Sequence, residues 1–335
     1  MIDRRSTLKL FAGAGALAAG VSTVGRAQTA PPETGEELPR GLPQPTATID
    51  LWPAGAPGAP RKPVKETVTE RSTDSHLTDR AVVGISRPRM AVFRPRIPNG
   101  GAVLLTPGGG YKRVVVDKEG YEMGRWLAAR GFTVFVLFYR LPGEGWAAGP
   151  DVALSDAQRA IRLIRNRAGD FGVDPERVAA MGFSAGGHVC ADLTTRFATK
   201  TYAAVDDADV LSARPLVAAM IYPVISMSAP VAHAGSREYL LGKDASPELE
   251  RAHSPTHNVP SNAPPCFLVH AEDDTSVVVE NSLEFSAALR AQSIPVETHL
   301  FTHGGHGFGL RKAVGKPIAI WPDLFVNWSQ TMGLT

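Results

Sequence analysis

Apolar runs and helix-type patterns alternate along most of the chain. Runs such as FTVFVLF and LVAAMIY are apolar without interruption, which is typical of parallel strands covered on both faces. Stretches with apolar residues at helical spacing follow them. We therefore predict strand–helix pairs over 102–106 and 121–130, 132–139 and 152–168, 177–182 and 185–197, 266–270 and 278–291, and 296–301 and 318–331, with a strand over 216–222 before short helices. This alternation predicts an α/β protein with one doubly wound, mostly parallel central sheet and helices on both faces.

The first 27 residues lack this alternation and have the features of an export signal. They contain Arg4 and Arg5, then a weakly apolar run of 12 residues, which is too short to span a bilayer. They end in Gly-Arg-Ala, a small-x-small cleavage motif. The arginine pair resembles a twin-arginine signal, although Thr7 stands where that signal usually has phenylalanine. We therefore expect a signal peptide over 1–27 and a periplasmic or secreted protein, with an N-terminal helix of the fold as the alternative.

The segment 28–63 is rich in Pro, Gly and Ala, for example in PAGAPGAPRKP. This composition disfavours helices and strands. We therefore expect a linker over 28–63 and a single folded domain over 64–335, in which AVVGISRPRMAVFRPR predicts early strands.

Composition and charge exclude several classes of function. The chain is 44% hydrophobic and 20% charged, and its 335 residues can bury one sizeable core. Its net charge of +2 becomes −1 without residues 1–27, which hold four basic residues and one acidic residue. A near-neutral body offers no electrostatic basis for binding nucleic acid or an anionic membrane. We also expect no metal and no cofactor, because the chain has neither a zinc-type spacing nor a phosphate-binding glycine motif.

The two cysteines, Cys190 and Cys266, both fall in segments that we predict to be core. Cysteine at such positions is usually a small buried apolar residue. Because an exported protein can oxidise its thiols, a disulfide between them is the alternative.

Candidate chemistry begins at GFSAG, residues 182–186, between a predicted strand and a predicted helix. Glycines two residues before and after Ser184 allow the strand and the helix to pass close together. Ser184 then lies at the tip of a strained turn with its hydroxyl available as a nucleophile. An ordinary glycine-rich turn is the alternative, so the remaining residues of such a site must be present elsewhere.

A histidine base is expected in the loop after the last strand, if the chain order is serine, acid, histidine. That loop contains THGGHGFGL, which offers His303 and His306. We favour His306 because it lies deeper in the loop between glycines, while His299 lies within the strand and is expected to be structural. The acid is expected after the preceding strand, where Glu272, Asp273 and Asp274 are all candidates.

Oxyanion donors are expected from the residue after the nucleophile and from a loop after an earlier strand. Three glycines, 108–110, follow the predicted strand 102–106. Glycines expose their N–H groups to a ligand without interference from a Cβ. A flexible turn is the alternative interpretation.

With these motifs together, the chain resembles α/β-hydrolase-fold carbohydrate esterases of the acetylxylan-esterase type, which are often labelled xylanase-like. The resemblance covers residue 51 to the C-terminus and rests on PGGGY, EGYEMGRWLAARGFTVFVLFYRLP, GFSAGGHVCADL, FLVHAEDDTSVVVENS and GGHGFGL. It implies Ser184 as nucleophile and His306 as base. The family pattern H-G-x-x-D-x-x-V-P, placed on HAEDDTSVV, selects Asp274 as the acid, although Ala271 and Val278 replace the glycine and the proline.

The same resemblance implies an oxyanion hole formed by the N–H groups of Gly109, Gly110 and Ala185. It also implies that the side chain of Tyr111 lies near the pocket mouth and contributes to substrate binding. We therefore expect a secreted serine esterase without cofactors that hydrolyses short acyl esters, chiefly acetyl esters, of oligosaccharides or other small molecules.

Two other functions are compatible with parts of this pattern. One is a prolyl-oligopeptidase-like peptidase, which uses the same order of triad residues, although no propeller domain precedes the hydrolase unit here. The other is a non-catalytic binding protein on a hydrolase fold. The presence of serine, histidine and aspartate together disfavours a non-catalytic protein.

Overall fold

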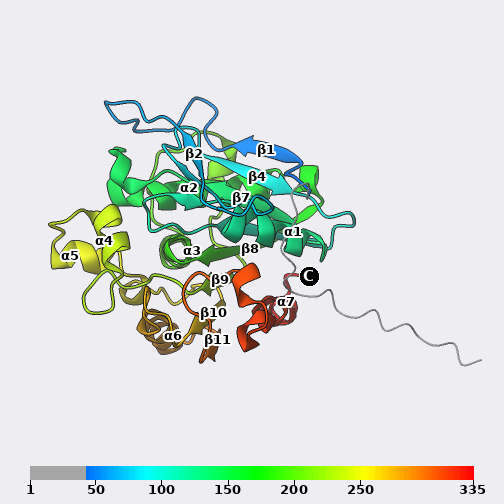
Figure 1. Cartoon of the computed structure of the whole chain (residues 1–335). Helices are drawn as coiled ribbons and strands as arrows, with labels where there is room; N and C mark the ends of the chain where they lie inside the picture. Colours follow the sequence, from blue (N-terminus) through cyan, green and yellow to red (C-terminus); the bar gives the residue numbers. More distant parts are fainter. Residues whose placement is uncertain (1–42) are drawn as a thin grey trace, which may run out of the picture. The chain divides into compact units, whose positions relative to one another are not determined.

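A computed structural model describes residues 43–335 (Figure 1). The expected signal peptide and the first part of the expected linker lie outside these residues. No helix within 43–335 combines the length and the apolar character needed to cross a membrane.

A mostly parallel sheet of eight strands forms the centre of the protein. Its spatial order is β1 (Ala47–Asp50), β4 (Arg89–Phe93), β7 (Thr133–Phe138), β5 (Gly100–Thr106), β8 (Val173–Phe183), β9 (Ala218–Ile221), β10 (Cys266–Ala271) and β11 (Val296–Phe301), from top to bottom in Figure 1. The six strands from β7 to β11 in this order are parallel to one another, whereas β4 runs antiparallel to both of its neighbours, β1 and β7. This confirms the α/β class and the mostly parallel sheet.

Helices pack against both faces of this sheet. Every residue of β7, TVFVLF, is buried. Because successive side chains of a strand point to opposite faces, complete burial requires cover on both sides. The longer helices are α1 (Glu122–Ala128), α2 (Val152–Asn166), α3 (Ala185–Arg196), α4 (Ala234–Leu241), α6 (Glu280–Ala291) and α7 (Trp321–Thr331), with a short α5 (Pro247–Ala252).

The predicted elements agree with the structure to within a few residues. The strand β11 covers the predicted range 296–301. The helix α7 begins three residues later than predicted, because residues 317–320 form a 3₁₀ turn that precedes it. Cys190 and Cys266 are both buried and unbridged.

The expected linker is partly wrong, because residues 47–50 form the edge strand β1, which pairs with β4. The stretch TIDLW supplies enough apolar side chains to join the core, since Ile49, Leu51 and Trp52 are at most 5% exposed. The Pro- and Gly-rich composition around this stretch concealed it.

A second sheet of three antiparallel strands lies beside the site described below, and the sequence predicted only its middle strand, at the start of AVVGISRPRMAVFRPR. It consists of β2 (Thr67–Glu70), β3 (Arg80–Val83) and β6 (Val114–Val115). The strand β6 has only two residues and follows the glycine loop that ends β5, so it ties this loop to β3.

Candidate active site

Ser184 lies at a sharp turn between the end of β8 and the start of α3. Its φ of 52° and ψ of −121° are strained for a residue other than glycine. The neighbouring glycines are required by close packing of backbone. A Cβ on Gly182 would lie 2.2 Å from the carbonyl oxygen of Gly186, and a Cβ on Gly186 would lie 2.0 Å from that of Thr106. The predicted nucleophile-type turn is therefore present in the structure.

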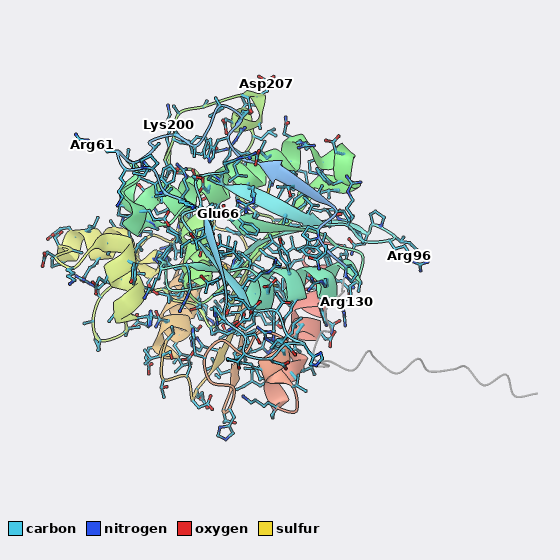
Figure 2. The ribbon with its side chains drawn as sticks, turned by 45° about the horizontal axis from the view of Figure 1, so that its top comes forward. Arg61, Glu66, Arg96, Arg130, Lys200 and Asp207 are labelled. Atoms are coloured by element: carbon cyan, nitrogen blue, oxygen red, sulfur yellow. The ribbon has the colours of Figure 1, made fainter. Side chains whose placement is uncertain are left out.

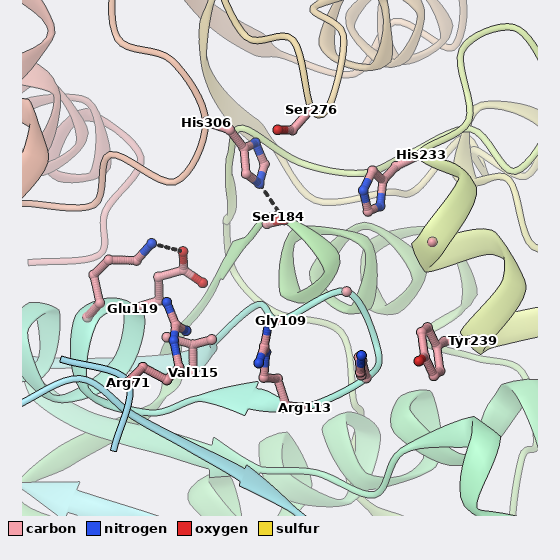
Figure 3. A pocket seen from close by; sticks show the side chains of 14 residues that line it. Arg71, Gly109, Arg113, Val115, Glu119, Ser184, His233, Tyr239, Ser276 and His306 are labelled. Carbon is pink, nitrogen blue, oxygen red and sulfur yellow. Dashed lines mark hydrogen bonds and ion pairs between the residues drawn. The ribbon is translucent and has the colours of Figure 1, made fainter. Parts of the chain in front are cut away.

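Ser184, His306 and Asp274 form one hydrogen-bonded chain, although they are distant in sequence (Figure 3). The distance from Ser184 Oγ to His306 Nε2 is 2.9 Å, and that from His306 Nδ1 to Asp274 Oδ2 is 2.7 Å. A carboxylate only accepts, so Nδ1–H of His306 donates to Asp274 and leaves Nε2 free to accept from the serine hydroxyl. This is the tautomer in which a histidine can remove the proton of a serine.

Asp274 is buried in the loop after β10, and both of its carboxylate oxygens have partners. Its Oδ1 accepts from the N–H groups of Ser276 and Val277, both at 2.9 Å. Its Oδ2 also lies 3.3 Å from Nε2 of His270. Burial acts to raise the pKa of Asp274, but the bonds from His270 and His306 outweigh it and hold this pKa below its usual range. The acid therefore stays ionised and holds the imidazole of His306.

The structure also distinguishes Asp273 from Asp274, which the residues by themselves left as alternative candidates for the acid. Oδ1 of Asp273 accepts from the N–H groups of Gly304 and Gly305, at 2.8 and 2.7 Å. Its Oδ2 lies 3.5 Å from Nδ1 of His303, which is largely exposed. Asp273 and His303 thus hold the outside of the loop, while Asp274 contacts His306 on the inside.

The glycine loop after β5 presents free backbone donors to the same space. Gly109 and Gly110 have φ of 132° and 66° and both line the pocket. Within residues 43–335, neither N–H group has an acceptor, whereas the N–H of Gly108 donates to Glu119 Oε2 at 2.8 Å. The N–H of Ala185, in the first turn of α3, has no acceptor within the helix.

The expected position of Tyr111 at the pocket mouth is wrong. Its side chain is only 2% exposed, and its hydroxyl donates to Nδ1 of His188 at 2.7 Å. The other ring nitrogen of His188 donates to the carbonyl of His253 at 2.7 Å, so the phenol has a satisfied partner inside the protein. His233, the N-cap of α4, and Tyr239, in its last turn, line the pocket instead.

Glu119 and Lys118, which reasoning from the sequence missed, connect the two loops of the site. They lie in the π-helical turn Asp117–Tyr121 and are 3% and 7% exposed. Besides the N–H of Gly108, Glu119 accepts from the hydroxyl of Tyr222 at 3.1 Å and pairs with Lys118 Nζ at 3.3 Å. Lys118 Nζ also donates to the carbonyl of Gly307 at 2.9 Å, beside His306.

The charge state of Glu119 follows from these contacts. Burial acts to raise its pKa, but Lys118 and the N–H of Gly108 outweigh it and hold the pKa below the ordinary value. An ionised Glu119 binds the glycine loop at Gly108 and pairs with Lys118, which in turn binds Gly307 in the loop that carries His306. One buried ion pair therefore links these two loops. A charged pair directly before a predicted helix was the only sequence signal for it.

A pocket of about 350 Å³ opens above Ser184. Figure 3 shows Ser184 between His306 on one side and the Gly109 loop on the other. The pocket is lined by Arg71, Gly109, Gly110, Lys112, Arg113, Val115, Lys118, Glu119, Ser184, His233, Gly235, Tyr239, Ser276 and His306. The arrangement can bind a small carbonyl compound with its carbon at the serine and its oxygen at the free N–H groups.

One cluster of metal-ligating types was found among residues 43–335, away from this pocket. It consists of Asp151, Asp192 and His253. Arg196 already pairs with the two carboxylates, at 2.8 and 3.2 Å, so a cation of the protein itself offsets part of their charge.

Comparison with known proteins places this site in a family. A family model described as BD-FAE matches residues 98–289, more than half of the chain. An acetylxylan esterase of Xylanibacter ruminicola is 32% identical over 67% of the chain and 44% of its own length. The endo-1,4-beta-xylanase B of Butyrivibrio fibrisolvens is 36% identical over 69% of the chain and 35% of its own length. The chain thus spans less than half the length of these two relatives.

A solved structure covers more of the chain. The crystal structure of an acetyl ester-xyloside bifunctional hydrolase from Caldicellulosiruptor lactoaceticus superposes with a TM-score of 0.69 at 33% identity. The match covers 88% of this chain and 99% of that one. The chain therefore belongs to the BD-FAE family of α/β-hydrolase-fold esterases.

Proposed function

We propose that this protein is a serine esterase that removes short acyl groups, chiefly acetyl, from carbohydrates. The hydrogen-bonded chain from Ser184 through His306 to Asp274, beside unbonded backbone donors, carries the proposal. The names of the relatives, an acetylxylan esterase and an acetyl ester-xyloside hydrolase, support the choice of acyl group and alcohol.

The proposed mechanism has two acyl-transfer steps. Ser184 Oγ attacks the ester carbonyl carbon while His306 Nε2 takes its proton, and the tetrahedral oxyanion is bound by the N–H groups of Ala185, Gly109 and Gly110. The C–O bond to the sugar breaks, and His306 gives the proton to the departing sugar oxygen. A water then attacks the acyl-enzyme, again losing its proton to His306, and the acid leaves as Ser184 is restored. Asp274 stabilises the imidazolium in both steps.

Cleavage of glycosidic bonds fits this pocket poorly. Glycosidases of the usual kind need two carboxyl groups that flank the scissile bond. Glu119 is the one carboxylate that lines this pocket, and it is bound to Lys118, Tyr222 and Gly108. Asp274 lies behind His306 and is 4% exposed. We therefore assign the ester bond, rather than the glycosidic bond, as the bond that is cleaved.

Acetate release from acetylated xylo-oligosaccharides and hydrolysis of 4-nitrophenyl esters test the proposal. Ser184→Ala is expected to lower kcat by at least about 10⁴-fold, because the covalent route is lost. Ser276→Ala is the matched control, since it removes the other serine of the pocket. Circular dichroism and Tm report whether each variant is folded. Turnover by folded Ser184→Ala, or cleavage of peptidyl anilides without release of acetate, would refute the esterase mechanism.

We further propose export through the twin-arginine route, on the basis of Arg4 and Arg5, which lie outside the described residues. Replacing both with lysine should leave a folded precursor in the cytoplasm, and the exported wild type should begin at Gln28. Fractionation and N-terminal sequencing give the answer, and normal export of the double-lysine variant would contradict it.

A further inference from the structure

The pocket over Ser184 is lined by an excess of positive charge. Of its 14 lining residues, four carry a cation and one carries a carboxylate. That carboxylate, Glu119, is buried and already paired with Lys118. The excess is local, because the chain beyond residue 27 has a net charge of −1. It therefore reflects the pocket rather than a generally basic protein.

Two of these cations have no acidic partner within residues 43–335. Lys112 and Arg113 are both exposed, and Nζ of Lys112 lies 5.8 Å from the ring centroid of Tyr239. A third, Arg71, pairs with Asp79 at 3.1 Å, but Asp79 also pairs with Arg311 at 2.9 Å. Figure 3 shows Arg71 and Arg113 on the side of the pocket that carries Gly109. We call these three exposed cations, Arg71, Lys112 and Arg113, the rim of the pocket. The rim carries positive charge that acidic residues within 43–335 do not fully neutralise.

We propose that this rim binds a carboxylate on the alcohol part of the ester, so that the preferred substrate is an acylated acidic sugar of the uronic-acid type. This inference rests on the proposed esterase function. A short acyl group bound at Ser184 ends inside the pocket, so the exposed rim contacts the sugar. The guanidinium of Arg113 matches the two oxygens of a carboxylate, and the ammonium of Lys112 adds a point charge.

Two acetylated sugars that differ only in the carboxylate test this assignment. Fully acetylated methyl xyloside and fully acetylated methyl glucuronoside have the same ring and esters, and the second adds one carboxylate. The glucuronamide of the same sugar controls for size without charge. We expect kcat/KM for the glucuronoside to exceed that for the other two by about tenfold at low salt, as two exposed charge contacts allow. This preference should shrink as NaCl is raised, because exposed charges are screened.

Charge-removing variants locate the effect. Lys112→Gln and Arg113→Gln should each lower the glucuronoside-to-glucuronamide ratio of kcat/KM by about threefold, and the double variant should bring it near one. Arg61→Gln and Lys62→Gln are matched controls, because both residues are exposed and neither lines the pocket. Figure 2 shows Arg61 at the periphery of the molecule. These controls should leave the ratio unchanged.

The outcomes separate this inference from the proposed function. Absence of acetate release from every sugar would overturn the esterase function itself. Release from all three sugars at equal rates, or a preference that survives in the double variant, would overturn the rim assignment alone. A preference for 4-nitrophenyl succinate over the butyrate ester, without one for the glucuronoside, would place the charge on the acyl side and also overturn it.

Discussion

Glu119→Gln tests whether the buried ion pair between Glu119 and Lys118 positions the glycine loop, residues 108–110. The substitution keeps the shape of the side chain and removes its charge. It leaves Lys118, 7% exposed, with only the carbonyl of Gly307 as a partner. Breaking one side of a buried pair typically costs about 3 kcal/mol or more of the free energy of unfolding. The N–H of Gly108 donates to Oε2 of Glu119 and the hydroxyl of Tyr222 donates to Oε1, but the amide of glutamine has a single acceptor oxygen, so one of these two hydrogen bonds is lost.

The effect on catalysis follows from the position of this contact. Glu119 binds the loop one residue before Gly109, so its loss shifts the donors at Gly109 and Gly110 rather than deleting them. Loss of a whole oxyanion donor costs about 3 kcal/mol, or 10²- to 10³-fold in kcat. A displaced donor should therefore lower kcat by about 10- to 100-fold. KM should change little, because the oxyanion exists only in the transition state.

The assay compares kcat and KM for 4-nitrophenyl acetate with stability measured by urea unfolding. Lys118→Met and the double variant Glu119→Gln/Lys118→Met complete a double-mutant cycle. The double variant lacks both charges, so it contains no unpaired buried charge at this site. The double variant should recover part of the lost stability, while its kcat should stay low. If folded Glu119→Gln keeps kcat within about twofold of the wild type, Glu119 is a structural residue only, and the positioning role is refuted.

Three further predictions concern the acid, the serine turn and pH. Asp274→Asn should lower kcat by about 10⁴-fold and Asp273→Asn by less than about tenfold, because Asp274 contacts His306 whereas Asp273 lies near His303; equal losses in steady-state kinetics would contradict this. Gly186→Ala should destabilise by about 3 kcal/mol in urea unfolding, because its Cβ would meet the carbonyl of Thr106 at 2.0 Å; an unchanged midpoint would show that the backbone yields. Burial of Glu122, the first residue of α1, outweighs the nearby guanidinium of Arg311 and raises the pKa of Glu122 from 4.5 to about 8. A carboxyl with a raised folded pKa loses its stabilising contribution as pH rises from about 4.5 to 8. Glu122→Gln should therefore match the wild type at low pH and be more stable above about pH 8, by at most about 5 kcal/mol; a constant difference across pH would contradict the shift.

Much of the fold is predictable because the buried strands carry a continuous apolar signal. The run FTVFVLF has no other simple interpretation, and the strand β7 occupies it. The three-stranded sheet has no such signal. All four residues of β2 are exposed, and β6 has only two residues, so both depend on contacts with β3 rather than on their own composition. For the same reason, the edge strand β1 was assigned to a linker.

In the candidate site, too, some residues could be predicted from the sequence, whereas the roles of others depend on tertiary contacts. Ser184 and His306 could be proposed because each follows a strand and chain order restricts the choice. The same reasoning left Glu272, Asp273 and Asp274 open, and only the family pattern selected Asp274. The side-chain direction of Tyr111 was beyond such reasoning, since the choice between pocket and core depends on its partner His188, 77 residues away. Lys118 and Glu119 look like a solvated helix start, and only the tertiary contact with Gly307 identifies them as buried.

The two sheets divide the pocket between them, and this has a consequence for how such an enzyme can diversify. The serine, the aspartate and the histidine follow strands of the central sheet, whereas Arg71 follows β2 and Arg113 precedes β6 of the small sheet. Because β2 is fully exposed, substitutions there cost little stability. Selection, or a designer, can therefore change the charge that Arg71 brings to the pocket by replacing the segment around β2, without altering the strands that the serine, the aspartate and the histidine follow.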